Sequence, residues 1–177
     1  VDRTAGNDQV MLFASSGKVI RFAEADVRLM GRNAAGVRGI RLPEGENAAV
    51  IALIVVREGE ILTVTEHGYG KRTPATDYPL RGRGGQGVLA LKQSDKTGAV
   101  VGATQVLGDD EIMLISNMGT LIRTAVAEVS VLGRNTQGVR IIRVADDQRL
   151  VGVDRIATDD ADDAADDPEA ADDDAID

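Results

Sequence analysis

Cysteine and tryptophan are both absent from this 177-residue chain, and aromatic residues make up only 2% of it. Without cysteine the chain can form no disulfide and no thiolate metal site, and with so few aromatic side chains its core must be aliphatic. No apolar run reaches the length of about 18 residues that a membrane-spanning helix needs. No secretory signal is visible near Val1, so we expect a cytoplasmic protein.

Positive charge is missing from the end of the chain. From Asp159 to Asp177 there are ten Asp and one Glu but no Lys or Arg, and the charge of these eleven acids exceeds the whole net charge of −9. Residues 1–157 hold the other 18 acidic residues and all 20 basic ones, so this part is slightly basic. A segment of Asp and Ala buries too little apolar surface to fold, and we expect residues 158–177 to be disordered.

A glycine-arginine motif recurs at a fixed spacing. Residues 31–41 (GRNAAGVRGIR) and 133–143 (GRNTQGVRIIR) are identical at eight of eleven positions, and a looser copy begins at Gly82. The three copies start 51 residues apart. A constant period of this size predicts an array of similar supersecondary units.

Each repeat predicts four short strands and no amphipathic helix. Glycines at 17, 68 and 119 lie between the first two apolar runs, where a tight hairpin needs a positive φ. A half-turn of helix is possible after the second strand, but Pro74 and Pro79 argue against a full one. The predicted strands are 10–13, 61–64 and 112–115; 18–22, 69–73 and 120–124; those starting at Val37, Val88 and Val139; and 50–56, 100–103 and 150–153. This pattern indicates all-β blades arranged radially or in a spiral.

The period divides the chain into blades at residues 9–59, 60–110 and 111–157. Residues 1–8 match residues 153–160, where the third repeat ends, at five of eight positions. We therefore expect residues 1–8 to be the end of a preceding repeat, and the chain to be part of a longer protein with further repeats upstream.

Enzyme motifs are nearly absent. The one histidine, His67, stands in a predicted hairpin turn, where a turn residue is a better interpretation than a catalyst. The glycine-rich stretch 82–87 lacks the Lys-Ser/Thr pair of a phosphate-binding loop, and no helix pattern follows it. Tyr69 and Tyr78 do not recur in the other repeats, and we interpret both as structural.

Basic residues recur in register and carry the functional prediction. Three sets have one member in each repeat, two further arginines match each other, and Lys71 lies beside a member of the first set. These candidates are Arg21, Arg72 and Arg123; Arg32, Arg83 and Arg134; Arg41, Lys92 and Arg143; Arg38 and Arg140; and Lys71. In a radial array they would form a track for a polyanion, since phosphate contact needs only cations and backbone N–H groups. The scarcity of aromatics favours a bent duplex over a single strand. The alternative is a solvated surface on which Asp26, Asp77 and Glu128 pair with these cations.

The repeats resemble the C-terminal domain of the A subunit of DNA gyrase, a bacterial type IIA topoisomerase. The matching motifs are GVRGIR at 36–41, GYGKRT at 68–73 and GRNTQGV at 133–139, and an acidic tail also fits the family. The resemblance implies a β-pinwheel of six propeller-like blades of four antiparallel strands, with strands exchanged between neighbours. This chain would hold the last three blades and the tail.

The resemblance also implies a function. The family domain wraps duplex DNA around its basic rim and so supports ATP-dependent negative supercoiling by the whole topoisomerase, an isomerase. The implied partners are duplex DNA, the rest of gyrase A and, through it, gyrase B in a heterotetramer, at the nucleoid of a bacterial cytoplasm. The DNA-cleaving tyrosine and the sites for ATP and Mg²⁺ lie in other parts of that enzyme, so we predict no catalytic, cofactor-binding or metal-binding residue here. We also expect the acidic tail to compete with DNA for the rim and so modulate access.

Two alternatives remain open from the sequence. The C-terminal domain of the corresponding topoisomerase IV protein has a similar fold and serves decatenation, and the regulator of chromosome condensation family builds protein-interaction propellers from repeats of similar length. The hallmark Gln-Arg-Arg-Gly-Gly-x-Gly box of gyrase is only approximated at 81–87, RGRGGQG, with the Gln and one Arg replaced. We expect the true box upstream of Val1.

Overall fold

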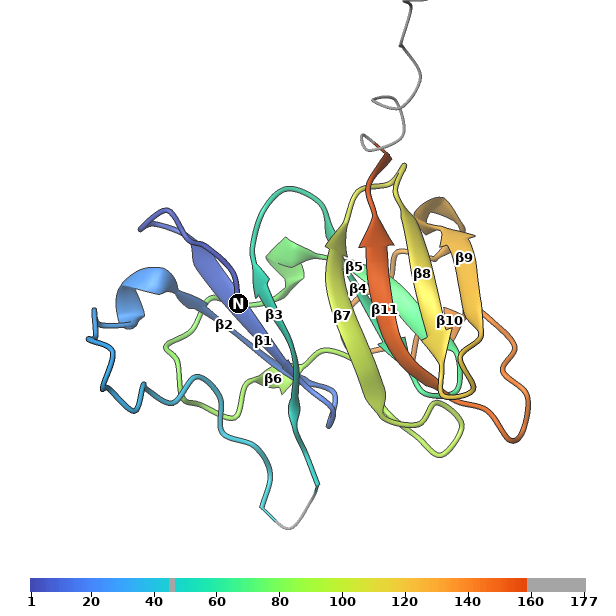
Figure 1. The fold of residues 1–177 in the computed structure, drawn as a ribbon, viewed down its shortest axis with the longest axis horizontal. Coiled ribbons are helices and arrows are strands. Elements are labelled where there is room, and N and C mark those ends of the chain that lie inside the picture. Colours follow the sequence, from blue (N-terminus) through green and yellow to red (C-terminus); the bar gives the residue numbers. More distant parts are fainter. Residues whose placement is uncertain (45–46, 159–177) are drawn as a thin grey trace, which may run out of the picture.

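Three antiparallel β-sheets make up the described part of the chain, residues 1–44 and 47–158 of a computed structural model (Figure 1). The strand orders are β3–β1–β2–β6, β7–β4–β5–β10 and β11–β8–β9. The strands are β1 Gln9–Ala14, β2 Lys18–Ala23, β3 Val50–Val55, β4 Glu60–Thr65, β5 Tyr69–Pro74, β6 Val88–Leu89, β7 Val100–Val106, β8 Glu111–Ser116, β9 Leu121–Ala125, β10 Val139–Arg140 and β11 Leu150–Ile156. The predicted all-β class is confirmed.

A tight hairpin joins the first two strands of every repeat. The turn glycines have φ values of 75° at Gly17, 78° at Gly68 and 79° at Gly119, in the left-handed region that L residues rarely adopt. Each second strand then passes into a single turn of 3₁₀-helix, and these turns are η1 Glu24–Asp26, η2 Ala75–Asp77 and η3 Val126–Glu128. The chain next leaves its own sheet.

The third strand of a repeat completes the sheet of the preceding repeat. β6 pairs with β2, with Val88 opposite Val19, and β10 pairs with β5, with Val139 opposite Gly70. The strand predicted to start at Val37 does not form, because no described residue offers this segment a second-strand edge to pair with. The third sheet has three strands within the described residues rather than four, because no later described segment pairs with β9 as β6 pairs with β2 and β10 with β5.

The second glycine of the repeated motif permits this exchange. Gly138 has a φ of 78°, and a Cβ there would lie only 2.5 Å from the carbonyl oxygen of Gly70. Gly87 has a φ of 70°, and a Cβ there would lie even closer to the carbonyl oxygen of Val19. The incoming loop therefore lies directly on the backbone of the preceding repeat, where a side chain would not fit.

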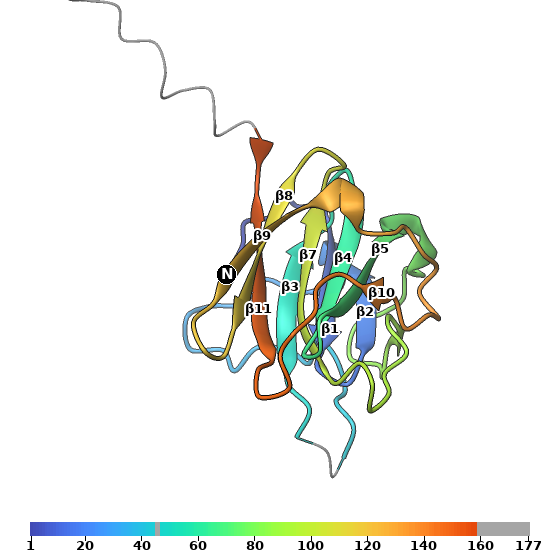
Figure 2. The ribbon, with the colours of Figure 1, turned by 90° about the vertical axis from the view of Figure 1, so that its right-hand side faces the viewer.

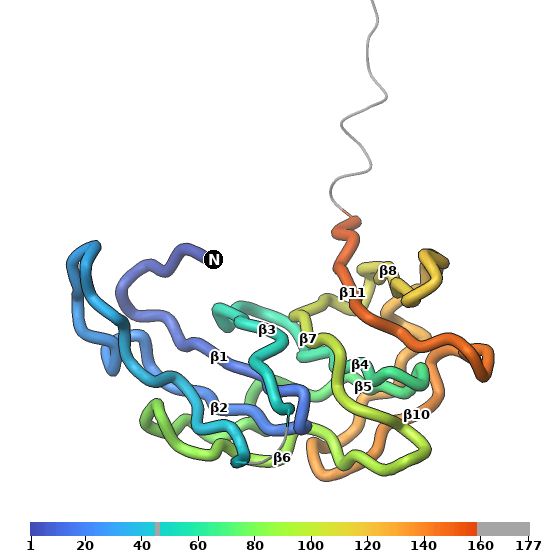
Figure 3. The backbone as a smooth tube through the Cα atoms, turned by 60° about the horizontal axis from the view of Figure 1, so that its bottom comes forward, coloured from blue at the N-terminus to red at the C-terminus, as the bar shows by residue number. Residues whose placement is uncertain are grey.

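The three sheets pack face to face and lie in succession across the molecule, in the order of the repeats (Figures 2 and 3). The middle sheet is covered on both faces, and every residue of β4 after Glu60 is buried. Its two faces contribute to separate aliphatic clusters, one shared with the first sheet and one with the third. Tyr78 is buried in the first of these, edge-on to Phe13 with ring centroids 6.1 Å apart, which gives it the structural role that we predicted.

Candidate nucleic-acid interface

The first set of repeated arginines joins neighbouring repeats. Nη1 of Arg21, on β2, donates to the carbonyl oxygens of Ala75 (2.6 Å) and Tyr78 (3.0 Å) in the next repeat. At the equivalent place Nε of Arg72, on β5, donates to the carbonyl oxygen of Val129 at 2.7 Å. Both side chains are partly buried, so much of their donor capacity is used inside the array rather than at the surface.

Arg123, the third member of this set, has a different environment. Its Nε donates to the Glu111 carboxylate at 2.6 Å, and its side chain remains 60% exposed. Within the described residues no further repeat follows β9 to supply carbonyl acceptors. The same sequence position is therefore a connector in two repeats and a surface ion pair in the third.

The second set is carried by the glycine-arginine loops. Arg83 donates through Nη1 to the carbonyl oxygen of Arg38 at 3.1 Å, and Arg134 donates in the same way to that of Leu89, also at 3.1 Å. These contacts hold each loop against the preceding repeat. Arg32, the first member, is exposed and makes no side-chain hydrogen bond or ion pair within the described part of the chain.

The third set is exposed in all three repeats: Arg41, Lys92 and Arg143. Main-chain bonds fix the first two beside the next loop, since the N–H of Arg41 donates to Gly85 at 2.8 Å and that of Lys92 donates to Thr136 at 3.0 Å. Each junction between repeats therefore brings a third-set cation next to the loop that carries Arg83 or Arg134. Arg38 and Arg140 are two further exposed arginines on the same loop-strand segments.

Lys71 is inside the protein rather than on its surface. The residue has no solvent exposure, and its ammonium group donates to the carbonyl oxygens of Gly133 (2.7 Å), Arg134 (2.6 Å) and Thr136 (3.2 Å). Burial, with the nearby charge of Arg134 as a second cause, lowers the pKa of Lys71 from 10.5 to about 8. Its buried ammonium cannot reach a phosphate at the surface, so we replace the predicted DNA contact by a positioning role for the loop 133–136.

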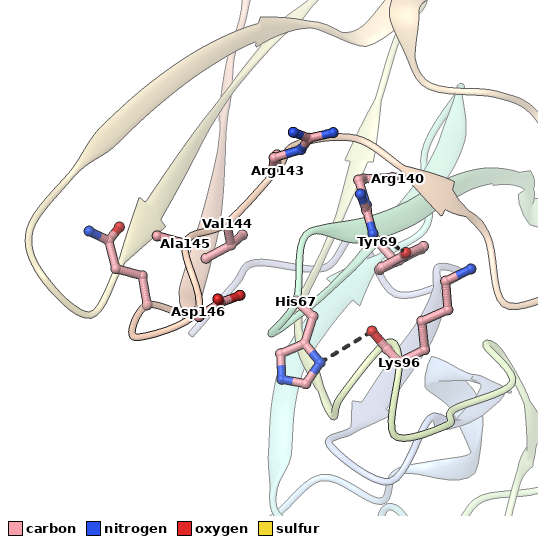
Figure 4. Close-up of a pocket in the computed structure, with 9 residues that line it drawn as sticks. His67, Tyr69, Lys96, Arg140, Arg143, Val144, Ala145 and Asp146 are labelled. Atoms are coloured by element: carbon pink, nitrogen blue, oxygen red, sulfur yellow. Dashed lines mark hydrogen bonds between the residues drawn. The ribbon is translucent and has the colours of Figure 1, made fainter.

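Sequence reasoning missed one basic cluster, at the junction of the second and third repeats (Figure 4). Lys96, absent from the predicted set, lines a pocket there with Arg140 and Arg143. The Tyr69 ring lies between two of these cations, 5.3 Å from Lys96 Nζ and 5.3 Å from Arg140 Cζ. The one signal was that Tyr69 breaks the repeat pattern, in which Lys18 and Thr120 occupy the equivalent positions.

The fold and these side chains define a class of protein: an array of propeller-like blades with exchanged strands and a basic residue pair at each junction. Sequence comparison agrees, since the family described as DNA gyrase C-terminal domain, beta-propeller, matches three segments, residues 8–57, 59–106 and 110–157. These segments cover most of the chain. The chain therefore belongs to the DNA gyrase C-terminal domain family.

Similar proteins include the A subunits of DNA gyrase from several bacteria. The one from Salmonella typhimurium is 55% identical over 158 residues, which are 89% of this chain and 18% of that protein. The one from Pseudomonas aeruginosa is 55% identical over 154 residues, which are 86% of this chain and 16% of that protein. The chain thus spans under a fifth of the length of these relatives, and corresponds to one part of gyrase A.

Solved structures show the same architecture. A structure of the DNA gyrase A C-terminal domain matches with a TM-score of 0.78 at 33% identity, covering 85% of this chain and 51% of that one. The C-terminal domain of DNA topoisomerase IV matches with the same TM-score at 21% identity, covering 85% of this chain and 47% of that one, which shows a shared fold alone. No helix among the described residues has the length and apolarity that crossing a membrane would require.

Proposed function

We propose that this chain binds duplex DNA through its backbone, without sequence specificity, along the line of blade junctions. The observation that carries the proposal is the exposure of Arg41, Lys92 and Arg143 in all three repeats, two of them bonded to the loop of the next repeat. Cations at a regular pitch can neutralise successive phosphates, and such contacts position a duplex without reading its bases. The three sheets succeed one another across the molecule (Figure 3), and we propose that a duplex following their junctions is bent.

Within a whole gyrase, this binding would contribute to DNA wrapping and to ATP-dependent negative supercoiling. The remainder of gyrase A, gyrase B and duplex DNA are the partners that we propose. ATP and Mg²⁺ would act in other parts of the enzyme, and the chain itself would contribute no cofactor site. The proposed location of this activity is the bacterial nucleoid.

The acidic tail is the last part of the proposal. Residues 159–177 lie outside the described residues, and the eleven acids of this segment, tethered directly to the last blade, form a local polyanion. This polyanion would compete with DNA phosphates for the basic junctions. Removing it should raise DNA affinity at low salt, and the gain should shrink as salt rises, because screening weakens both sets of contacts.

The test is a titration of a labelled duplex at several salt concentrations, with and without the tail. If about six phosphates are neutralised, the logarithm of the binding constant should fall against the logarithm of salt concentration with a slope of about −5. The double substitution R41Q/K92Q should make that slope shallower by about 2, whereas the control R3Q/R57Q, which removes two charges from another part of the chain, should leave it unchanged. A slope near zero for the unaltered chain would refute DNA backbone binding.

A further inference from the structure

The pocket between the second and third repeats has a composition that the repeat pattern does not explain. It has a volume of about 790 Å³ and is lined from three separate segments: the start of β5 with the turn before it, the loop before β7, and the end of β10 with the residues that follow it. The first supplies Tyr69, the second Lys96, and the third Arg140 and Arg143 (Figure 4). No two of these segments are adjacent in sequence, so the pocket exists only because the third repeat sends β10 onto the second.

The Tyr69 hydroxyl is the polar centre of this pocket. Nη2 of Arg140 donates to it at 2.8 Å, and Lys96 and Arg140 flank the ring whose main part is buried against the sheet. Burial alone would raise the pKa of Tyr69, but the hydrogen bond from Arg140 and the charges of Arg140 and Lys96 outweigh it, so the pKa of the phenol is lowered. A phenol whose anionic form is favoured lies in a positive field.

The charges that face the pocket leave it positive. Three cations, Lys96, Arg140 and Arg143, oppose one carboxylate, Asp146, and Nδ1 of His67 lies 3.2 Å from the Lys96 main-chain carbonyl oxygen. The guanidinium groups offer planar pairs of N–H donors, Lys96 offers a mobile ammonium, and the tyrosine offers an O–H. Tetrahedral oxyanions with several acceptor oxygens match this set of donors.

The preceding junction provides an internal comparison. A smaller cavity near that junction, about 430 Å³, is lined by Lys18 and Arg41 together with Glu44 and Gln86, and Lys92 stands there at the position of Arg143. Lys18 occupies the Tyr69 position there, and Leu89 occupies the position of Arg140. The more cationic pocket is therefore particular to one junction, and its Arg140 can be compared directly with a leucine that the same fold accepts.

We propose that Tyr69, Lys96, Arg140 and Arg143 form a binding site for one phosphate group. The source of that phosphate is a backbone position of the bound duplex, held at this junction by more donors than at the one before, and this part of the inference rests on the proposed function. A soluble phosphorylated compound shares the same chemistry and is the other source that the experiment separates.

The first measurement is the salt dependence of duplex binding by the variant K96M/R140L. If one backbone phosphate occupies the pocket, loss of this contact should make the slope of the logarithm of the binding constant against the logarithm of salt concentration shallower by about 1. The variant R57Q is the control for removal of a charge elsewhere. Circular dichroism and the unfolding midpoint verify that each variant is folded. The single variant K96M is a second test, because Lys96 is exposed and its replacement should leave the fold intact. Unchanged slopes in both variants would remove DNA as the source.

The second measurement reads the pocket directly through tyrosinate absorbance. The chain has only two tyrosines, and burial raises the pKa of Tyr78 to about 12, so Tyr69 titrates first. A bound phosphate offsets the positive charges, and both the duplex and pyrophosphate should therefore raise the pKa of Tyr69 and leave Tyr78 unchanged. The shift should be lost in K96M/R140L.

The combined outcomes separate the two proposals. A shift with pyrophosphate and an unchanged duplex slope would assign the site to a free phosphorylated compound. A pyrophosphate shift in a chain that fails to bind duplex would refute the proposed function and leave the pocket standing. No shift with either probe, together with unchanged slopes, would overturn the phosphate site.

Discussion

Two opposing effects act on the buried ammonium group of Lys71, and their balance can be measured. Burial removes water from the charge, which costs free energy, while three main-chain carbonyls and the Thr136 hydroxyl accept hydrogen bonds from it. The perturbation is Lys71→Met, which keeps an unbranched side chain, one atom shorter, and removes the charge. Lys92→Met, at an exposed lysine, is the matched control.

The size of the effect follows from the lowered pKa of Lys71. A fall from 10.5 in the unfolded chain to about 8 in the folded one means that the charged form costs the folded state about 3 kcal/mol below pH 8. Between pH 8 and 10.5 the unfolded chain binds a proton that the folded chain has released. Stability therefore rises with pH across this window, the opposite of the usual behaviour of a lysine that gains a partner.

The assay is urea unfolding of the unaltered chain and Lys71→Met, each between about pH 7 and about pH 9.5. The free energy of unfolding of the unaltered chain should increase by about 2 kcal/mol relative to Lys71→Met over this range. The comparison between chains removes the titration of all other groups, and Lys92→Met should track the unaltered chain throughout.

The reverse result would refute this account. If the unaltered chain loses stability relative to Lys71→Met as pH rises, the four acceptors stabilise the ammonium by more than burial penalises it. Lys71 would then be a charge-dependent anchor of the loop that carries Arg134, and DNA binding would weaken at high pH for that reason.

Two further predictions compare equivalent positions of the repeat. Arg72→Met should cost about 2–4 kcal/mol of unfolding free energy, since it leaves the partly buried Val129 carbonyl and Glu60 without their donor. Arg123→Met, at an exposed ion pair, should cost no more than about 1 kcal/mol. Equal losses in urea unfolding would show that the bonds between repeats contribute nothing. The variant Gly138→Ala should be less stable than Gly36→Ala by about 1–3 kcal/mol. Both glycines have a positive φ, but only at Gly138 would a Cβ meet a neighbouring carbonyl. Similar unfolding midpoints for the two variants would contradict the close approach of the loop.

Much of the candidate site could be predicted because the repeat fixes equivalent residues at equivalent places. The cations at 41, 92 and 143 were identified from their spacing alone, and the structure exposes all three. Spacing could not show which repeated cation faces solvent. Arg21 and Arg72 face the next repeat, and Lys71 faces its loop, because exposure depends on the element that packs above each side chain.

Local chemistry determined the elements of this protein, and long-range pairing determined how they join. Short apolar runs, glycines that supply positive φ and a constant period of 51 residues are properties of neighbouring residues, so the sequence by itself established an all-β array with a tight hairpin in each repeat. The pairing of strands is not a property of neighbouring residues. The backbone edge of β5 can pair with any extended segment, and the segment that pairs with it, β10, lies about 70 residues further along the chain. The family resemblance implied that neighbouring repeats exchange strands, but only the tertiary structure decided that β10 is the strand that completes the preceding sheet, and with it that Tyr69 and Arg140 meet in one pocket.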